Sequence, residues 1–376
     1  MFAKRLVLSL IFATLACLAF ASFTTVSEAG GDKKKGKKKV VKKKEVWTDA
    51  ADPTLPADFK YQGEYLIQER DGASIGAQVI ALGNGYFQAV MLKRGLPGMG
   101  WNGSAKALLD GKLDGDKVTF TPAAGKRKYL AQSPLEFAAT TKFTPIPAGQ
   151  MSAVISGDVM TLDVVEGDKK ELAALKKITR KSPTLGQKPP EGALVLFDGT
   201  NKSEWNGGRL DKKTGFLNTD GSDMTTKRKF SNYLVHVEFL LPFRPAARGQ
   251  GRGNSGFYQV DHYEVQILDS FGLDGKNNEC GGVYSRLDPK LNMCLPPLQW
   301  QTYDVEFTNA VRDGDKLIKK SRLTVRLNGV VVHDNVEIPG VTGGARMEPE
   351  GTPGLLRLQG HGNPLQFRNI WIVEKK

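Results

Sequence analysis

Short runs of alternating apolar and polar residues, separated by Gly, Asp, Asn and Pro, recur from residue 47 onward and constrain the fold most. One example is Gln78–Leu82 followed by Tyr86–Leu92, with Gly83–Gly85 between them. Alternation with period two predicts half-buried strands, and a Gly-Asn-Gly turn predicts a β-hairpin. Leu113–Phe120 and Ile155–Leu162 repeat the pattern around Gly-Asp pairs. The chain is therefore expected to be all-β, and its 40% apolar and 25% charged residues are typical of a globular protein.

A proline-rich segment predicts where the chain divides. Residues 181–192 contain Pro183, Pro189 and Pro190 and show no periodicity, which indicates a linker. Residues 47–180 are expected to form a small β-rich accessory domain. Residues 193–376 carry about ten predicted strands, one of them at Gly282–Tyr284, and no clear helix. This pattern favours a two-sheet sandwich of the jelly-roll kind.

The first 29 residues have the order of a secretory signal peptide. Lys4 and Arg5 precede an apolar run from Leu6 to Phe20, and small residues follow in a spacing that suits signal peptidase. A membrane anchor needs about 20 apolar residues, and this run is shorter. We expect export to the periplasm or the extracellular space. A lipoprotein linked through Cys17 is the less favoured alternative, because the residues before it form a poor lipobox.

The net charge of +13 comes mostly from one tail. Residues 30–46 hold nine Lys against two acidic residues, so mutual repulsion predicts a disordered segment. Such a tail could contact anionic envelope polymers or lipid, or could serve only as a solvated spacer. It lacks interleaved aromatic residues, which argues against specific nucleic-acid recognition.

Cys280 and Cys294 remain after removal of the signal peptide. In an oxidising compartment they could form a disulfide, and the alternative of two buried thiols is equally open. No CxxC motif or paired His accompanies them, which disfavours zinc. The sequence requires no cofactor, and it leaves open a divalent metal such as Ca²⁺.

The segment Gly251–Gly256 matches the dinucleotide fingerprint GxGxxG by letter only. That motif works when a strand precedes it and a helix follows, so that the helix N-terminus receives the pyrophosphate. Here an Arg-rich loop precedes it and a predicted strand follows. We interpret it as a glycine-rich strand entry at the edge of a cleft.

The segment from Asp261 to Asp269 is the most informative. With period two, His262, Glu264 and Gln266 share one face of a predicted strand. A polar face suits either a solvent-exposed outer surface or a cleft that receives substrate. The glycine-rich approach and the neighbouring aromatic residues favour a cleft.

Residues Glu264 to Asp269 also partly resemble the E-x-D-x-x-E strand of laminarinase-type glucanases. Gln266 replaces the middle acid and Asp269 is shorter than the usual last Glu. Retaining glycosidases need two carboxyl groups about 5–5.5 Å apart, so a double displacement is not favoured here.

Among the four histidines, His361 is the candidate for proton transfer. It lies between two glycines in a predicted loop after a strand, where a side chain can be presented rather than packed. Histidine titrates near neutrality and suits a general acid or base, although an ordinary surface histidine is the alternative. His236 and His333 are interpreted as structural.

Successive motifs in the second half resemble one family in order. They are Phe197-Asp198-Gly199-Thr200, Asn254–Tyr258, Tyr263–Asp269, Trp300–Tyr303, Leu327–Val330, Leu358–Pro364 and Phe367–Ile370. Together they resemble the 3-keto-disaccharide hydrolase domain family over residues 191–376, in the arrangement of exported planctomycete members. The resemblance implies a concanavalin A-like lectin/glucanase β-sandwich that cleaves 3-keto-glycosides. It supplies no assigned catalytic residues.

The chemistry of such a substrate indicates which roles to fill. A C3 ketone acidifies the C2 hydrogen, so a base can form an enolate that expels the C1 substituent. We expect Glu264 and His361 to be the catalytic pair. Further substrate contacts are expected from Asn254, Tyr258, His262, Gln266, Asp269, Tyr284, Arg286 and Gln359. The alternatives are a non-catalytic carbohydrate-binding module and a cell-surface module on the same fold.

Overall fold

The structure is a computed structural model that describes residues 45–68, 74–104 and 106–375. From Glu45 onward the chain forms one compact unit. The predicted signal peptide, Cys17 and nearly all of the lysine-rich segment lie outside the described residues. Within the described ranges, the structure has no helix with the length and apolarity needed to cross a bilayer.

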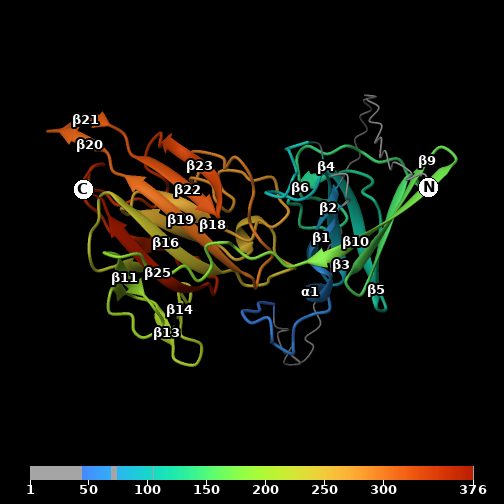
Figure 1. The fold of residues 1–376 in the computed structure, drawn as a ribbon, viewed down its shortest axis with the longest axis horizontal. Helices are drawn as coiled ribbons and strands as arrows, with labels where there is room; N and C mark the ends of the chain where they lie inside the picture. The colour runs from blue at the N-terminus through green and yellow to red at the C-terminus, as the bar shows by residue number, and fades with distance from the viewer. Residues whose placement is uncertain (1–44, 69–73, 105, 376) are drawn as a thin grey trace, which may run out of the picture. The chain divides into compact units, whose positions relative to one another are not determined.

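Eight antiparallel strands close into a barrel between residues 63 and 178, coloured blue to green in Figure 1. In order around the barrel they are β1 (Gly63–Gln68), β10 (Lys169–Ile178), β9 (Val159–Glu166), β8 (Met151–Ser156), β5 (Lys117–Pro122), β4 (Lys106–Asp114), β3 (Tyr86–Lys93) and β2 (Ser74–Gly83). The three predicted hairpins are confirmed as β2–β3, β4–β5 and β8–β9. In the first, Asn84 and Gly85 have φ of 55° and 73°, the left-handed values that a type I′ turn requires.

The strands β2 and β3 are buried on both faces. One face fills the barrel, and the other packs against Phe271 and Leu273, which follow the smaller sheet described below. Polar contacts join the same surfaces, since Arg248 donates to the Leu82 carbonyl at 2.9 Å and Arg252 to the Ala81 carbonyl at 3.3 Å. The barrel therefore contacts the loop that leads into the glycine-rich strand entry and the loop that follows the smaller sheet's last strand.

Residues 194–374 form two sheets that share one apolar core. The larger sheet contains β13 (Arg209–Asp211), β14 (Phe216–Asn218), β25 (Gln366–Glu374), β16 (Tyr233–Leu240), β19 (Trp300–Thr308), β22 (Arg322–Leu327) and β23 (Val330–Glu337), with β11 (Leu194–Phe197) paired to β25. The smaller sheet contains β12 (Trp205–Asn206), β15 (Met224–Thr226), β24 (Arg357–Leu358), β17 (Ser255–Gln259) and β18 (Tyr263–Ile267). Alternate residues of both sheets, such as Val237 and Val265, fill the core. The expected β-sandwich class agrees with this nearly all-β architecture.

Short elements complete the described chain. They are α1 (Asp58–Tyr61), β6 (Lys128–Tyr129), β7 (Phe137–Ala138), the 3-10 turn η1 (Gly249–Gly251), β20 (Val311–Asp313) and β21 (Lys316–Lys319). The predicted strand at Gly282–Tyr284 is wrong. Val283 makes only isolated bridges, because Gly281 and Ser285 have φ of 88° and 56° and turn the chain on both sides. This irregular segment directs Tyr284 toward the site described below.

The proline-rich segment is docked on the larger sheet. The Thr184 hydroxyl donates to Asp304 at 2.9 Å, and the Gly186 amide donates to Glu238 at 2.5 Å. His236 is fully buried and bonds the other oxygen of Asp304 at 2.6 Å, consistent with a structural role. His333 is also buried, with its Nε2 bonded to the Gly281 carbonyl at 2.8 Å.

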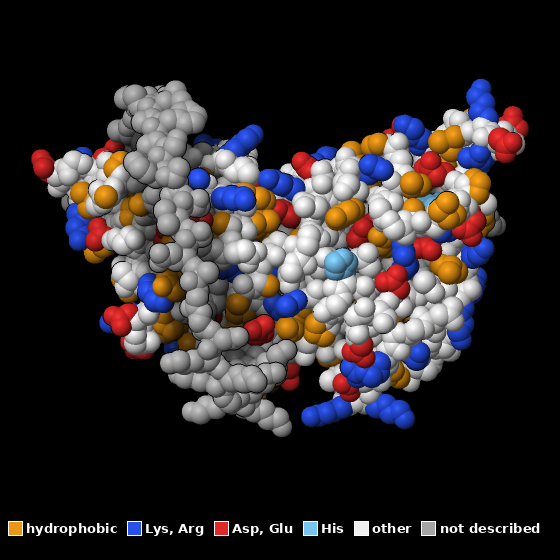
Figure 2. Space-filling view, turned by 180° about the vertical axis from the view of Figure 1, so that it is seen from behind, with side chains coloured by type: hydrophobic (Ala, Val, Ile, Leu, Met, Phe, Trp, Pro, Cys, Tyr) orange, Lys and Arg blue, Asp and Glu red, His pale blue; other side chains and the backbone are white. Residues whose placement is uncertain are grey.

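Charged side chains of both signs are interspersed on the face seen in Figure 2. This agrees with the sequence, in which the lysine-rich tail supplies most of the excess positive charge. Among the described side chains visible in this view, the two signs are mixed and form no broad basic patch for a polyanion.

Candidate functional site

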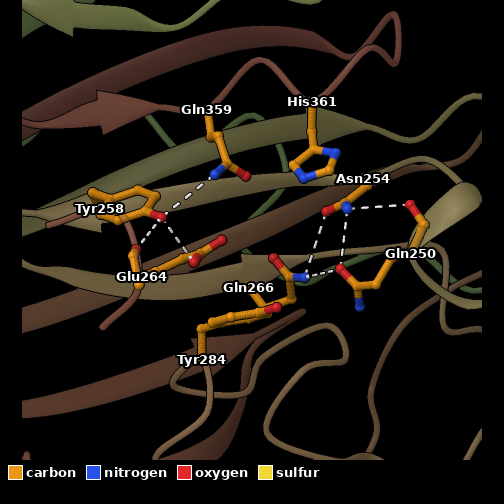
Figure 3. Close-up of a pocket in the computed structure, with 10 residues that line it drawn as sticks. Gln250, Asn254, Tyr258, Glu264, Gln266, Tyr284, Gln359 and His361 are labelled. Atoms are coloured by element: carbon orange, nitrogen blue, oxygen red, sulfur yellow. Dashed lines mark hydrogen bonds between the residues drawn. The ribbon is translucent and has the colours of Figure 1, made fainter. Parts of the chain in front are cut away.

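A polar cavity of about 130 Å³ opens beside the smaller sheet (Figure 3). Its lining consists of Gln250, Asn254, Tyr258, Glu264, Gln266, Tyr284, Gly343, Gly344, Gln359 and His361. Seven of these ten were expected from the sequence, including the proposed pair Glu264 and His361. The lining contains no Lys or Arg and a single carboxylate. Its size and its amide and hydroxyl groups suit one neutral sugar unit.

The hairpin formed by β17 and β18 builds one wall of this pocket. Tyr258 pairs directly with Glu264 across the two strands, and Gly256 pairs with Gln266. Residues two apart point to the same face of a strand, so all four positions face the cavity side. The segment after β24 brings Gln359 and His361 to the opposite side, as Figure 3 shows. The sequence alternation around Glu264 therefore marks a cleft rather than an exposed outer surface.

Gly256 makes room for the carboxylate. A Cβ at this position would overlap Glu264 Oε1 and would lie 2.7 Å from its Cδ. The backbone of Gly256 does not have a positive φ, so flexibility is not the reason for glycine here. The missing side chain instead lets the Glu264 carboxyl group lie over the neighbouring strand.

Burial dominates the electrostatics of Glu264, whose side chain is 3% exposed. Burial raises the pKa of Glu264 to about 7 from its ordinary value of 4.5. The hydrogen bond from Tyr258 and the positive charge of Arg357 oppose that rise in pKa without cancelling it. A carboxyl group with this pKa can exchange a proton near neutral pH, which an ordinary surface glutamate rarely does.

Tyr258 has one hydroxyl proton and two neighbouring acceptors. Its oxygen lies 2.9 Å from Glu264 Oε2 and 2.7 Å from the Gly343 carbonyl. When Glu264 is ionised, the hydroxyl donates to the carboxylate. When Glu264 is protonated, the carboxyl group can donate to Tyr258, which then donates to Gly343. Tyr258 is thus suited to stabilise both protonation states of Glu264.

The variant Tyr258→Phe is expected to raise the pKa of Glu264 further. It removes the hydrogen bond that favours the ionised carboxylate, which should move the titration upward by about one pH unit. Carbon-13 NMR of labelled glutamate, assigned with Glu264→Gln, measures this directly. An unchanged titration midpoint in a folded variant would contradict the role given to Tyr258.

The His361 side chain is exposed, and close packing and hydrogen bonds fix the loop that carries it. A Cβ on Gly360 would overlap the backbone of Ser222, and the Gly360 amide donates to Asp223 at 2.8 Å. The Asn363 side chain donates to the His361 carbonyl at 3.0 Å. In Figure 3 the imidazole points into the cavity from the side opposite Gln266 and Tyr284. The glycine before His361 therefore serves close packing.

Three predicted substrate contacts lie outside the pocket, and the first is His262. The strand β18 begins at Tyr263, because Val260 and Asp261 have φ of 45° and 58° and form the preceding turn. The alternation therefore does not extend to residue 262. His262 is buried, and its Nε2 bonds the Glu348 carbonyl at 2.8 Å.

Asp269 and Arg286 also lie outside the pocket lining. Asp269 follows the end of β18 and forms a buried ion pair with Arg252, with Nε 2.9 Å from Oδ2. It does not line the pocket with Glu264, so the resemblance to the glucanase strand does not extend to a carboxylate pair. Arg286 is exposed and donates to the Val341 carbonyl at 2.6 Å.

Gln250 is the lining side chain that sequence reasoning missed. It lies in η1, immediately before the glycine-rich segment, and bonds the side chains of Asn254 and Gln266. A glutamine among arginines and glycines carries no chemical signal of its own. Its position next to a segment already interpreted as a cleft edge was the one available hint.

The structure holds Cys280 and Cys294 as buried free thiols rather than as a disulfide. Cys280 Sγ lies 3.3 Å from the Tyr303 hydroxyl, in the apolar core. In the described ranges, no group of three His, Cys, Asp or Glu side chains is arranged to hold a metal ion.

The half of the chain that contains the pocket resembles known proteins. Residues 192–373 match the family described as the 3-keto-alpha-glucoside-1,2-lyase-like domain. A solved "putative glycosyl hydrolase" of Parabacteroides distasonis is 30% identical, and the match covers 50% of this chain and 85% of that one, with a TM-score of 0.45. Residues 192–373 therefore form a domain of the 3-keto-alpha-glucoside-1,2-lyase-like family. A second structure of the same description and organism is 20% identical, with 50% and 95% coverage and a TM-score of 0.37.

No curated protein matches the chain. Membership of this family supports a carbohydrate-active enzyme. The family match begins at residue 192, so it does not include the barrel of residues 63–178.

Proposed function

We propose that the pocket cleaves glycosides of 3-keto sugars. The observation that carries this proposal is Glu264, a buried carboxyl group with a pKa of about 7 that faces His361 across a neutral, sugar-sized cavity. A base of this pKa suits removal of the C2 hydrogen that a C3 ketone acidifies. The family description supports the same substrate class.

The elimination half of the proposed reaction has two proton transfers. Glu264 takes the C2 proton, and the electron pair moves into a C2–C3 enolate. The enolate then expels the C1 oxygen, which takes a proton from His361. Water then adds to C1 of the C1–C2 double bond and gives a proton to His361, while Glu264 returns a proton to C2, which completes hydrolysis and restores both groups. Tyr284 and Gln359 supply donors for the enolate oxygen.

The different environments of Glu264 and His361 support Glu264 as the base. The carboxyl group is buried and fixed by Tyr258, whereas the exposed His361 lies where a departing sugar would leave. Direct displacement through two carboxylates fits less well, since Glu264 is the one acid among the residues that line this pocket.

The test is turnover of 3-keto-trehalose and 3-keto-sucrose, followed by sugar release with and without a chelator. In heavy water, elimination and hydration should place deuterium at C2 of the released keto sugar, beyond the exchange of that sugar alone. A non-catalytic binding module would bind these compounds and release nothing. Hydrolysis without excess deuterium would support direct displacement instead.

The variant His361→Ala should lower the rate on 3-keto-disaccharides about 10²-fold or more, because the leaving oxygen loses its acid. The side chain is exposed, so the melting temperature should stay unchanged. A nitrophenyl 3-keto-glucoside, whose leaving group needs no protonation, should lose much less rate. An equal loss on both substrates would contradict the acid role.

A further inference from the structure

The orientation of the Gln266 side chain is fixed by its neighbours. Its Nε2 lies 3.0 Å from Gln250 Oε1, 3.4 Å from Asn254 Oδ1 and 3.5 Å from the Asn278 carbonyl. Exchange of its nitrogen and oxygen would place an acceptor against three acceptors. The amide nitrogen therefore faces this cluster, and the amide oxygen faces away from it.

The partners of Gln266 are fixed in turn by backbone carbonyls. Gln250 Nε2 donates to the Asn278 carbonyl at 2.7 Å. Asn254 Nδ2 donates to the Gln250 carbonyl at 3.1 Å and to Gln250 Oε1 at 3.0 Å. A main-chain carbonyl cannot become a donor, so the three amides cannot reverse their directions one by one.

This arrangement leaves one buried acceptor without a partner. Gln266 is 1% exposed, and no residue in the described part of the chain donates a hydrogen bond to its Oε1. Figure 3 shows the side chain at the cavity wall, with its oxygen on the cavity side. A buried carbonyl oxygen without a donor is costly, and the remaining source of a donor is a molecule in the cavity.

We propose that Gln266 Oε1 accepts a hydrogen bond from one hydroxyl group of the bound sugar and so determines the orientation of the ring. The proposal rests on the proposed function, because it names the group that this sugar pocket recognises. A ketone oxygen cannot occupy the same place, since two acceptors would meet there. The keto oxygen is therefore excluded from the position next to Gln266 Oε1 and is left to a donor on the opposite side of the cavity, such as Gln359.

Binding without turnover tests this inference in the full chain. The probes are 3-ketoglucose and methyl glucoside, each with its set of singly deoxygenated analogues, titrated by calorimetry. Gln266→Met should weaken binding of the parent sugars about fivefold to tenfold. One deoxy analogue, which lacks the hydroxyl group that Gln266 recognises, should bind the wild type as weakly as the parent sugar binds the variant. The affinity of this analogue should fall less than about twofold further in the variant.

A matched control is Gln299→Met, which alters another buried glutamine oxygen that lacks a donor within the described ranges and lies outside the pocket lining. It should leave all affinities unchanged. Equal losses for every analogue in Gln266→Met, or no sugar binding by the wild type, would overturn the inference. If the effects of Gln266→Met and of removing one sugar hydroxyl were coupled, but the protein did not cleave 3-keto-glycosides, the inference would be supported and the proposed function rejected. Cleavage of 3-keto-glycosides without such coupling would support the proposed function and reject the inference.

Discussion

Replacement of Glu264 by Gln is expected to lower the rate of 3-keto-glycoside cleavage about 10³-fold or more, since the base for the C2 proton is lost. In the wild type, kcat/KM should rise with pH through about 7, because only the ionised carboxylate accepts that proton. The residual activity of the variant should lack this dependence. Full activity in Glu264→Gln would remove the proposed mechanism.

The same variant has a measurable effect on stability. The folded-state pKa of Glu264 is raised, so its favourable contribution is complete below the unfolded pKa near 4.5 and is lost as pH rises through about 7. Gln does not ionise. Between pH 4.5 and 8 the free energy of unfolding of the variant should therefore gain about 3 kcal/mol relative to the wild type. Chemical denaturation at both pH values measures this gain.

The second large effect is expected from Gly256→Ala. A methyl group there would overlap the Glu264 carboxylate oxygen, the far end of a flexible side chain that can move aside. Displacement of a catalytic group by about 1 Å costs about 10²-fold in rate, so a loss of that order should occur while the sheet remains folded.

The control for this prediction is Gly340→Ala, where a Cβ would have no neighbour within 4 Å among the residues that the structure describes. Its activity and melting temperature should match the wild type. If Gly256→Ala kept full activity, the carboxyl group would not need the position that the structure gives it. If it unfolded the protein, the neighbouring strand rather than Glu264 would set the need for glycine.

Local signals were sufficient for much of the fold and part of the site. Alternation and turn residues predicted the hairpins, since both depend on contacts between near neighbours. The same alternation placed Glu264 and Gln266 on one face, and two flanking glycines pointed to His361. Closure of the barrel between β1 and β10 joins residues more than a hundred positions apart and has no comparable local signal.

The differences between the predicted site residues and the pocket lining have the same physical origin. His262 depends on where the turn ends, which two unusual backbone angles decide. Asp269 depends on an arginine from a different loop, and Gln250 on amide partners that only the folded chain assembles. Side-chain roles that rest on distant partners could not be read from spacing.

The close approach of Gly360 to Ser222 has a consequence for related chains. No side chain fits at position 360 while the backbone of the opposing turn keeps its place. A relative with a larger residue there must carry a compensating deletion or retreat in the turn around residue 222. We therefore expect these two positions to change together during divergence, although neither lines the pocket.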